Sequence, residues 1–283
     1  MAGSPAVGRV TATLTFLAQH PHEAFTLSEL CRELNHSPAT AHALLNSLVS
    51  EGFLLREPAS RKYSLGPALV EIGAAAAARQ GDVLDFARAE LKELATALRR
   101  QCVVTQVVGH RIVFMAREGP ASAGGIAHQV GERVPFEPPI GTVFLAWSQR
   151  EEIEDWLRGI SPALGSRAIQ KCMRALRQVR ERGHSMSLAT RPHSSRLTEA
   201  SLDHLLNSRY FVDEIEPRAG YAVSHIGAPV FGADGRVVIA LSCAYLGEVV
   251  TGRQLRRDAA EIVAAADRVT KAIHGRKPDL PSY

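Results

Sequence analysis

Apolar residues recur with helical spacing in two short segments near the N-terminus. In each segment they occupy positions i, i+3, i+4 and i+7, which is one stripe of an amphipathic helix: Leu27, Leu30, Cys31 and Leu34, then Ala41, Leu44, Leu45 and Leu48. Thr26 and Glu29 have the spacing of a capping box, which starts the first helix. Ser37 suits an N-cap followed by Pro38 at the first helical position, and Gly52 ends the second helix.

The outward face of the second predicted helix is small, polar and uncharged. It consists of Ala39, His42, Ala43, Asn46, Ser47 and Ser50. A helix that only packs on a soluble domain usually carries Glu and Lys on that face, whereas this one suits close approach to base edges. Two short helices joined by a tight polar turn are typical of a helix-turn-helix DNA-binding domain. The alternative is a short structural helix beneath a loop.

A basic hairpin follows the second helix directly. Residues 53–55 and 62–65 have strand character, and residues 57–60 suit the turn between them. Arg56, Arg61 and Lys62 gather there against the single acid Glu57, so the tip can contact phosphates. Upstream, residues 7–17 keep helical spacing with Val7, Val10, Leu14 and Leu17, which predicts the supporting first helix of a winged helix-turn-helix over residues 1–66.

The next segment predicts a linker helix over residues 67–81, because Pro67 suits a helix start and residues 74–78 are all alanine. Gly81 is expected to break it, and Asp82 to cap a second helix that opens the C-terminal domain. The alanine-rich face permits close packing on a second copy of the chain, or alternatively within one chain.

Residues 82–275 predict an α+β domain, followed by a tail over 276–283. β-rich runs at 102–109 and 111–118 flank a turn at Gly109-His110, and a second pair at 221–231 and 237–245 flanks a turn at 233–235. Helices are expected at 140–147, 151–157, 167–182 and 251–274, with a strand at 184–190. This order predicts one sheet with helices on one face.

Composition narrows the function classes. With 283 residues, 46% hydrophobic and 22% charged, the chain has room for two domains and is typical of a soluble protein without a membrane span. No signal peptide is visible, and the four scattered cysteines favour reduced thiols in a cytoplasmic protein. The pair His20 and His22 lacks further metal ligands, and the Ser and His residues of 191–196 lack a catalytic frame. We therefore expect no metal, no cofactor and no enzymatic activity.

Charge bears on how the chain would bind DNA. Residues 1–66 hold as many acidic as basic side chains, so one copy should bind DNA weakly, because phosphate neutralisation supplies most non-specific affinity. Two copies on one DNA would supply the rest. The basic excess lies in residues 101–200, much of it in the Arg-rich segment 167–182, which is either a solvated helix face or a second nucleic-acid site.

The sequence resembles the IclR-type transcriptional regulators along nearly its full length. The N-terminal resemblance rests on LSELCRELNHSPATAHALLNSLVSEGFLLREPASRKYSLGPALVEIG, and the C-terminal one on VGERVPFEPPIGTVFLAW and GYAVSHIGAPVFGADGRVVIALS. It implies a C-terminal GAF-like effector-binding domain, double-stranded operator DNA as a partner, and a homodimer or dimer of dimers. The family often has a Ser-Thr pair early in the recognition helix and an Arg after its His, where this chain has Ala39-Thr40 and His42-Ala43.

These features together give the candidate site residues. For DNA they are Ser37, Pro38, Thr40, His42, Asn46, Ser47, Arg56, Arg61 and Lys62. For a ligand, the resemblance implies a pocket on one sheet face lined by Pro139, Ile140, Gly141, His225 and Ser242, with Ala244 beyond and an acid supplied by Asp213 or Glu214. Family members often carry Cys or Ser in place of His225 and Ser in place of Ala244. The alternative is that His225 and Ser242 are ordinary strand residues that contact no ligand.

Three functions come from this reading. The first is a DNA-binding regulator, repressor or activator, modulated by a small organic acid or aromatic effector. The second is an effector-independent DNA-binding protein whose C-terminal domain only dimerises. The third, an enzyme with a regulatory N-terminal domain, has no visible catalytic frame to support it.

Overall fold

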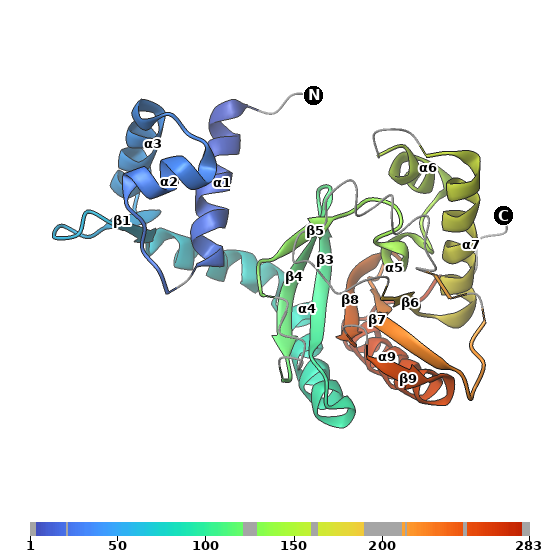
Figure 1. Ribbon diagram of the computed structural model, residues 1–283. Coiled ribbons are helices and arrows are strands. Elements are labelled where there is room, and N and C mark those ends of the chain that lie inside the picture. Colours follow the sequence, from blue (N-terminus) through green and yellow to red (C-terminus); the bar gives the residue numbers. More distant parts are fainter. Residues whose placement is uncertain are drawn as a thin grey trace. The chain divides into compact units, whose positions relative to one another are not determined.

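The computed structural model describes residues 4–20, 22–120, 129–159, 164–189, 211–212, 214–245 and 248–278. The chain divides into two compact units, residues 1–81 and 82–283 (Figure 1). No helix in the described ranges is both long and apolar enough to cross a bilayer. The segment 191–196, with its Ser and His residues, lies outside the described ranges.

Unit 1 is the predicted winged helix-turn-helix. Its helices are α1 (Pro5–Gln19), α2 (Leu27–Leu34) and α3 (Pro38–Ser50), and its hairpin pairs β1 (Leu54–Arg56) with β2 (Tyr63–Leu65) in antiparallel register. The apolar stripes read from the sequence meet in one core, whose buried members are Leu17, Leu30, Leu45, Leu48, Leu54 and Tyr63.

The helix ends of the turn follow the sequence signals. The capping box of α2 is complete, since the Glu29 backbone N–H donates to Thr26 Oγ1 (3.3 Å) and the Thr26 N–H donates to Glu29 Oε2 (2.7 Å). Asn35 ends α2 in the left-handed conformation (φ 51°), and the Ser37 side chain caps α3 (3.4 Å to the Thr40 N). These caps fix the angle at which α3 leaves the turn.

The helix after the hairpin differs from the prediction. A single helix, α4, runs from Ala68 to Leu98, so Gly81 does not break it and Asp82 does not cap a new one. One glycine inside a helix costs only about 1 kcal/mol relative to alanine, which the strong helix formers around it offset. Residues on both sides of the unit boundary therefore belong to one continuous helix.

Unit 2 is built on an antiparallel sheet. Its strands are β3 (Cys102–Val108), β4 (Arg111–Glu118), β5 (Arg133–Pro135), β6 (Ser185–Leu188), β7 (Gly220–Phe231), β8 (Val237–Ala244) and β9 (Val249–Thr251). They lie in the order β5-β4-β3-β8-β7-β6, with β9 paired to the start of β7. The strands expected from the sequence are confirmed, while β5 and β9 are additions of three residues each, too short to show an alternation.

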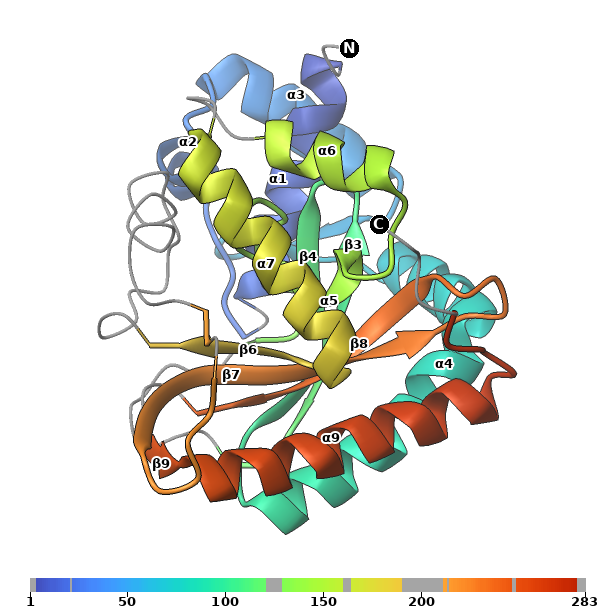
Figure 2. The same cartoon turned by 90° about the vertical axis from the view of Figure 1, so that its right-hand side faces the viewer.

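Helices cover both faces of this sheet, so the expectation of one covered face is wrong. On one face, α9 (Gly252–Ala272) and the second half of α4 enclose the main core with Leu91, Ile226, Leu241 and Ile262. On the other lie α5 (Thr142–Leu145), α6 (Arg150–Arg158) and α7 (Ser166–Arg182). Figure 2 shows α9 and α7 on opposite sides of β6 and β7. Ala240 and Phe231 face the second layer because successive strand residues point to opposite faces.

Candidate functional site

The exposed face of α3 is the first candidate site. His42, Ala43, Asn46 and Ser47 are all exposed, while Ala41, Leu45 and Leu48 on the opposite side are buried. Core packing therefore fixes the rotation of α3 and turns its uncharged polar side outward. A 3.3 Å hydrogen bond joins the Asn46 side-chain amide to His42 Nδ1, one turn apart.

Of the remaining α3 candidates, Ser37, Pro38 and Thr40 lie at the start of the helix and Ser47 lies near its end. Ser37 and Pro38 are exposed at its first turn, and the Ser37 hydroxyl donates to Thr40 Oγ1 (2.8 Å). Ser47 donates its hydroxyl to the Ala43 carbonyl (3.1 Å), so its oxygen is left as an acceptor. Backbone N–H groups at a helix start favour an anion such as a phosphate oxygen.

The hairpin tip carries the cationic part of this surface. Arg56, Arg61 and Lys62 are exposed, and no ion pair within the described residues engages them. The Arg56 guanidinium lies 5.6 Å from the centre of the Tyr63 ring, and Arg61 turns the chain with φ 55°. The one acid at the tip, Glu57, accepts a hydrogen bond from Ser60. The tip can thus offer its positive charge to a phosphate backbone.

The second candidate site lies on the sheet face that carries α5 and α7. Cross-strand partners share a face, and the register pairs His225 with Ser187 and with Ala244. A 2.8 Å hydrogen bond joins Ser187 Oγ to His225 Nδ1, which fixes the ring of the half-buried histidine. The structure therefore places a polar, oriented imidazole on this face.

Gly227 sets the shape of the same face between two serines. The register pairs it with Ser185 on one side and Ser242 on the other. A Cβ on Gly227 would collide with Ser242 Oγ, so the absence of a side chain lets that hydroxyl lie over the strand. Ser185 in turn donates to the Gly227 carbonyl (3.3 Å). His225, Ser187, Ser185 and Ser242 thus form one polar row, which we call the sheet-face row.

Residues 139–141 lie on the same side of the sheet, next to α5. Ile140 packs with Phe136 against a cluster of Ile112, Phe144 and Ala240, and Ala240 precedes Ser242 by two positions on β8. Gly141 has φ 100°, and a Cβ at this position would collide with the Phe136 ring, so the position requires glycine. Pro139 is buried. These residues and the sheet-face row therefore lie on one side of the sheet.

One of the two acids expected in the ligand pocket, Glu214, is exposed and lines a groove with His184 and Arg256. Asp213 lies outside the described residues.

Sequence reasoning missed two members of the sheet-face row, Ser185 and Ser187. The signal was the Ser-x-Ser alternation inside a short strand, which puts both hydroxyls on one face. The described residues hold no group of three or more His, Cys, Asp or Glu arranged for an ion. His20 instead bonds the Phe16 carbonyl through Nδ1 (2.8 Å) and packs against Phe25.

Comparison with known proteins identifies a matching domain family and several similar regulators. The model of the IclR helix-turn-helix domain matches residues 6–58. The chain is 26% identical over 163 residues to the HTH-type transcriptional regulator KdgR of Escherichia coli, covering 56% of this chain and 62% of that protein, less than two thirds of its length. It is 27% identical over 256 residues to the regulator XynR of the same species, covering 87% of this chain and 88% of XynR.

Solved structures share the fold over nearly the whole chain. A regulator from Alicyclobacillus acidocaldarius superposes with a TM-score of 0.68 at 24% identity, covering 96% of this chain and all of that one. An IclR homologue from Microbacterium hydrocarbonoxydans, solved in complex with 4-hydroxybenzoate, superposes with a TM-score of 0.65 at 18% identity, covering 95% of this chain and 98% of that one. At these identities the structural likeness establishes the fold alone.

Proposed function

Since the chain belongs to the IclR family of transcriptional regulators, we propose that it binds double-stranded operator DNA through α3 and the hairpin tip and that a small organic ligand on the sheet-face row changes this binding. The observation that carries the DNA part is the exposed, uncharged polar face of α3 on a helix capped at Ser37. Such a face can enter a major groove without desolvating a charge, and its side chains can read base edges.

Each part of unit 1 takes a separate role in this proposal. The amide of Asn46 suits the donor and acceptor of adenine, and His42 offers a ring nitrogen to a purine edge. The cations of the hairpin tip contact phosphates, which supply affinity without sequence information. The start of α3 at Ser37 adds backbone donors for one more phosphate.

Binding by more than one copy follows from charge. Unit 1 is close to neutral, so one copy gains little from phosphate contacts. On α4, Val70 and Ile72 are 73% and 52% exposed, which is unusual for large apolar side chains and suits burial against another chain. We therefore include a homodimer or a dimer of dimers on a near-palindromic operator in the proposal.

The ligand part rests on the sheet-face row. An oriented imidazole at His225 and the hydroxyls of Ser185, Ser187 and Ser242 can bond a carboxylate or a phenolic hydroxyl, while Ile140 offers apolar contact. The Microbacterium homologue was solved with 4-hydroxybenzoate, a ligand of this chemistry. A small organic acid or aromatic compound is the ligand class that we propose. No chemical step on that ligand belongs to the proposal.

The test uses 4-hydroxybenzoate, benzoate and succinate as probes. Each is titrated into the full chain while DNA-binding anisotropy and the thermal midpoint are recorded. We expect at least one carboxylate to raise the midpoint and to change DNA affinity at least about fivefold, a typical allosteric coupling. His225→Ala should abolish both responses, while His110→Ala, which removes an exposed histidine from the β3–β4 turn, should abolish neither.

Selective DNA binding that none of the probes alters, with no probe bound, would leave unit 2 as a dimerisation domain only. A response that survives His225→Ala would move the ligand away from the sheet-face row.

A further inference from the structure

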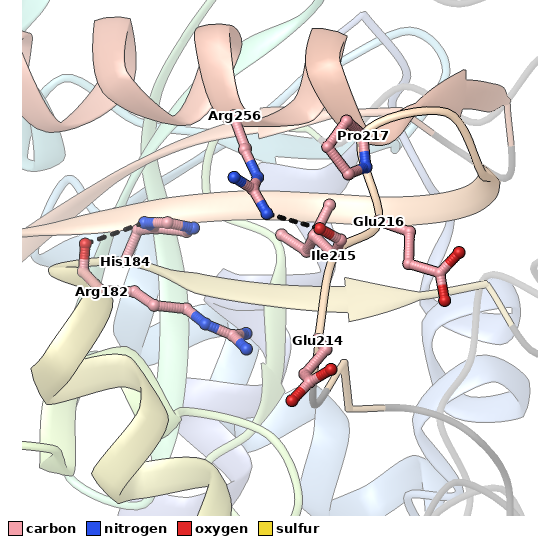
Figure 3. A pocket seen from close by; sticks show the side chains of 7 residues that line it. All are labelled: Arg182, His184, Glu214, Ile215, Glu216, Pro217 and Arg256. Atoms are coloured by element: carbon pink, nitrogen blue, oxygen red, sulfur yellow. Dashed lines mark hydrogen bonds between the residues drawn. The ribbon is translucent and has the colours of Figure 1, made fainter.

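A groove lies at the β6 edge of the sheet, between the end of α7 and α9. Its volume is about 470 Å³, within the range of small-ligand sites. Figure 3 shows its lining side chains, which come from the end of α7, the start of β6, the segment 214–217 and α9. They are Arg182, His184, Glu214, Ile215, Glu216, Pro217 and Arg256.

Strand geometry separates this groove from the proposed effector position. Ser185 and Ser187 face the row that contains His225. Because successive residues of a strand alternate in direction, Met186 and the preceding His184 face the other side. Met186 does pack in the core beneath α9. The residues that line the groove include no member of the sheet-face row.

Two guanidinium groups border the groove in fixed positions. Arg256 donates from Nη2 to the Ile215 carbonyl (2.6 Å), and Arg182 donates from Nη1 to the Val212 carbonyl (2.7 Å). Both bonds hold the chain segment that leads into β7. Since a guanidinium carries five N–H donors, one carbonyl contact of Arg256 fixes its place and leaves donors for a ligand.

His184 supplies a third polar group, aimed inward. Its Nδ1 bonds the Arg182 backbone carbonyl (3.1 Å), so Nδ1 carries the proton in the neutral ring. Nε2 is buried and has no hydrogen-bond partner within the described part of the chain. A buried polar atom without a partner costs free energy that a bound ligand can recover. Burial also lowers the pKa of His184 from its ordinary value.

We propose that this groove binds a small dianion, with Arg256 and Arg182 contributing charge and His184 donating from Nε2 after it takes up a proton. The chemical class is a sulfate- or phosphate-like group or a compact dicarboxylate. Glu214 and Glu216 limit the size of the ligand, because their carboxylates repel any anion that extends toward the 214–216 side. In Figure 3 the Glu216 carboxylate points away from Arg256 and His184.

Ligand binding in the groove should be coupled to protonation of His184 and should therefore depend on pH. The charge of Arg182 disfavours a charged imidazole at His184. The other charged groups around the groove are Arg256, Glu214, Glu216 and, near Gly183, the Lys277 amine. Without a ligand the lowered pKa keeps His184 neutral near neutral pH. A bound dianion stabilises the imidazolium, so binding must take up a proton and must strengthen as the pH falls.

The test is calorimetric titration of sodium sulfate into the full chain at constant ionic strength set with chloride. Sulfate remains a dianion across the pH range used, so a change in affinity reports the protein. We expect saturable binding that is at least about tenfold tighter near pH 6 than near pH 8, the ordinary range of histidine titration. Comparison of two buffers with different ionisation enthalpies should show uptake of up to one proton.

Variants locate the binding. Arg256→Gln should weaken sulfate binding at least about tenfold, the factor expected when a charged hydrogen bond is lost. His184→Gln should remove the pH dependence and the proton uptake. Arg257→Gln, a matched change on the same helix outside the groove, should leave binding unchanged, as should His225→Ala on the sheet-face row. Circular dichroism confirms that each variant is folded.

Three results would overturn the proposal. One is sulfate binding no stronger than that of chloride. Another is binding that Arg257→Gln weakens as much as Arg256→Gln does. The third is binding lost in His225→Ala but kept in His184→Gln, which would assign the anion to the sheet face. None of these depends on DNA binding, so the proposed function stands or falls separately.

Discussion

Two exposed side chains on α3, His42 and Asn46, are the candidates for contact with DNA bases. His42 and Asn46 are exposed one turn apart and bonded to each other, and neither takes part in the core. Because the core alone fixes the helix rotation, changing either side chain should leave the fold intact. The two residues can therefore be tested for base contact without a stability effect.

His42→Ala and Asn46→Ala should each lower affinity for the specific site by about 1–3 kcal/mol, the range for loss of a base contact. Non-specific affinity and the thermal midpoint should remain within error. Anisotropy on specific and scrambled duplexes measures both. Equal losses on the two duplexes would count against base readout.

At this scale the sequence predicted the unit 1 candidates well, because helical spacing and caps are local. Ser37, His42 and Asn46 are where the pattern put them. Unit 2 was harder. The bond between Ser187 and His225 joins residues 38 positions apart, and only the strand register shows it. Of the two acids that the resemblance implied for the ligand pocket, Glu214 lines the groove with Arg256, and Asp213 lies outside the described residues.

The N-terminal cap of α2 contains a titratable group, the Glu29 carboxyl. The hydrogen bond from the Thr26 backbone, followed by that from its side chain, lowers the pKa of the exposed Glu29 carboxyl below its ordinary value. A carboxyl with a lowered folded pKa stabilises the fold above the unfolded value of about 4.3. That contribution is lost as the pH falls through the lower folded value.

Glu29→Ala should therefore lower the thermal midpoint of unit 1 near neutral pH, and the difference from the unchanged chain should shrink as the pH falls below about 4. Differential scanning calorimetry at several pH values measures this. Glu33→Ala, on the same helix outside the cap, serves as the control. A difference that is constant with pH would mean that the capping box does not depend on the carboxylate.

The continuity of α4 is the second test at the scale of elements. If the helix runs through residue 81, Gly81→Ala should stabilise the chain by up to about 1 kcal/mol, because alanine is the better helix former. Gly73→Ala, at an exposed helical position with open space around it, should act in the same direction. Thermal unfolding measures both, and destabilisation by Gly81→Ala alone would restore a helix break.

The elements that the sequence missed share a cause. The strands β5 and β9 have three residues each and owe their form to pairing with β4 and β7. The second helical layer also depends on long-range contacts, since nothing in the spacing of 167–182 says which sheet face it covers. Gly81 misled the prediction because glycine ends helices when a cap follows, and tertiary context overrides that local signal.

At the scale of the whole molecule, the two candidate sites lie in different units of one chain. The DNA site is in unit 1 and the sheet-face row is in unit 2. α4 belongs to both units, since residues 68–81 fall in the first and 82–98 in the second. Under the proposed function, this unbroken helix would be the physical connection through which a ligand bound in unit 2 changes DNA binding by unit 1. This claim requires first that the chain selects a DNA sequence at all.

The most direct measurement is fluorescence anisotropy of the full chain on duplex DNA from upstream of its own gene, against a scrambled duplex of the same composition. The salt series runs from about 50 to about 200 mM, where phosphate contacts weaken strongly. The account predicts at least about a thousandfold preference for one sequence that persists at about 150 mM salt. Equal, weak binding to both duplexes, with no sequence enriched by selection from genomic DNA, would contradict it.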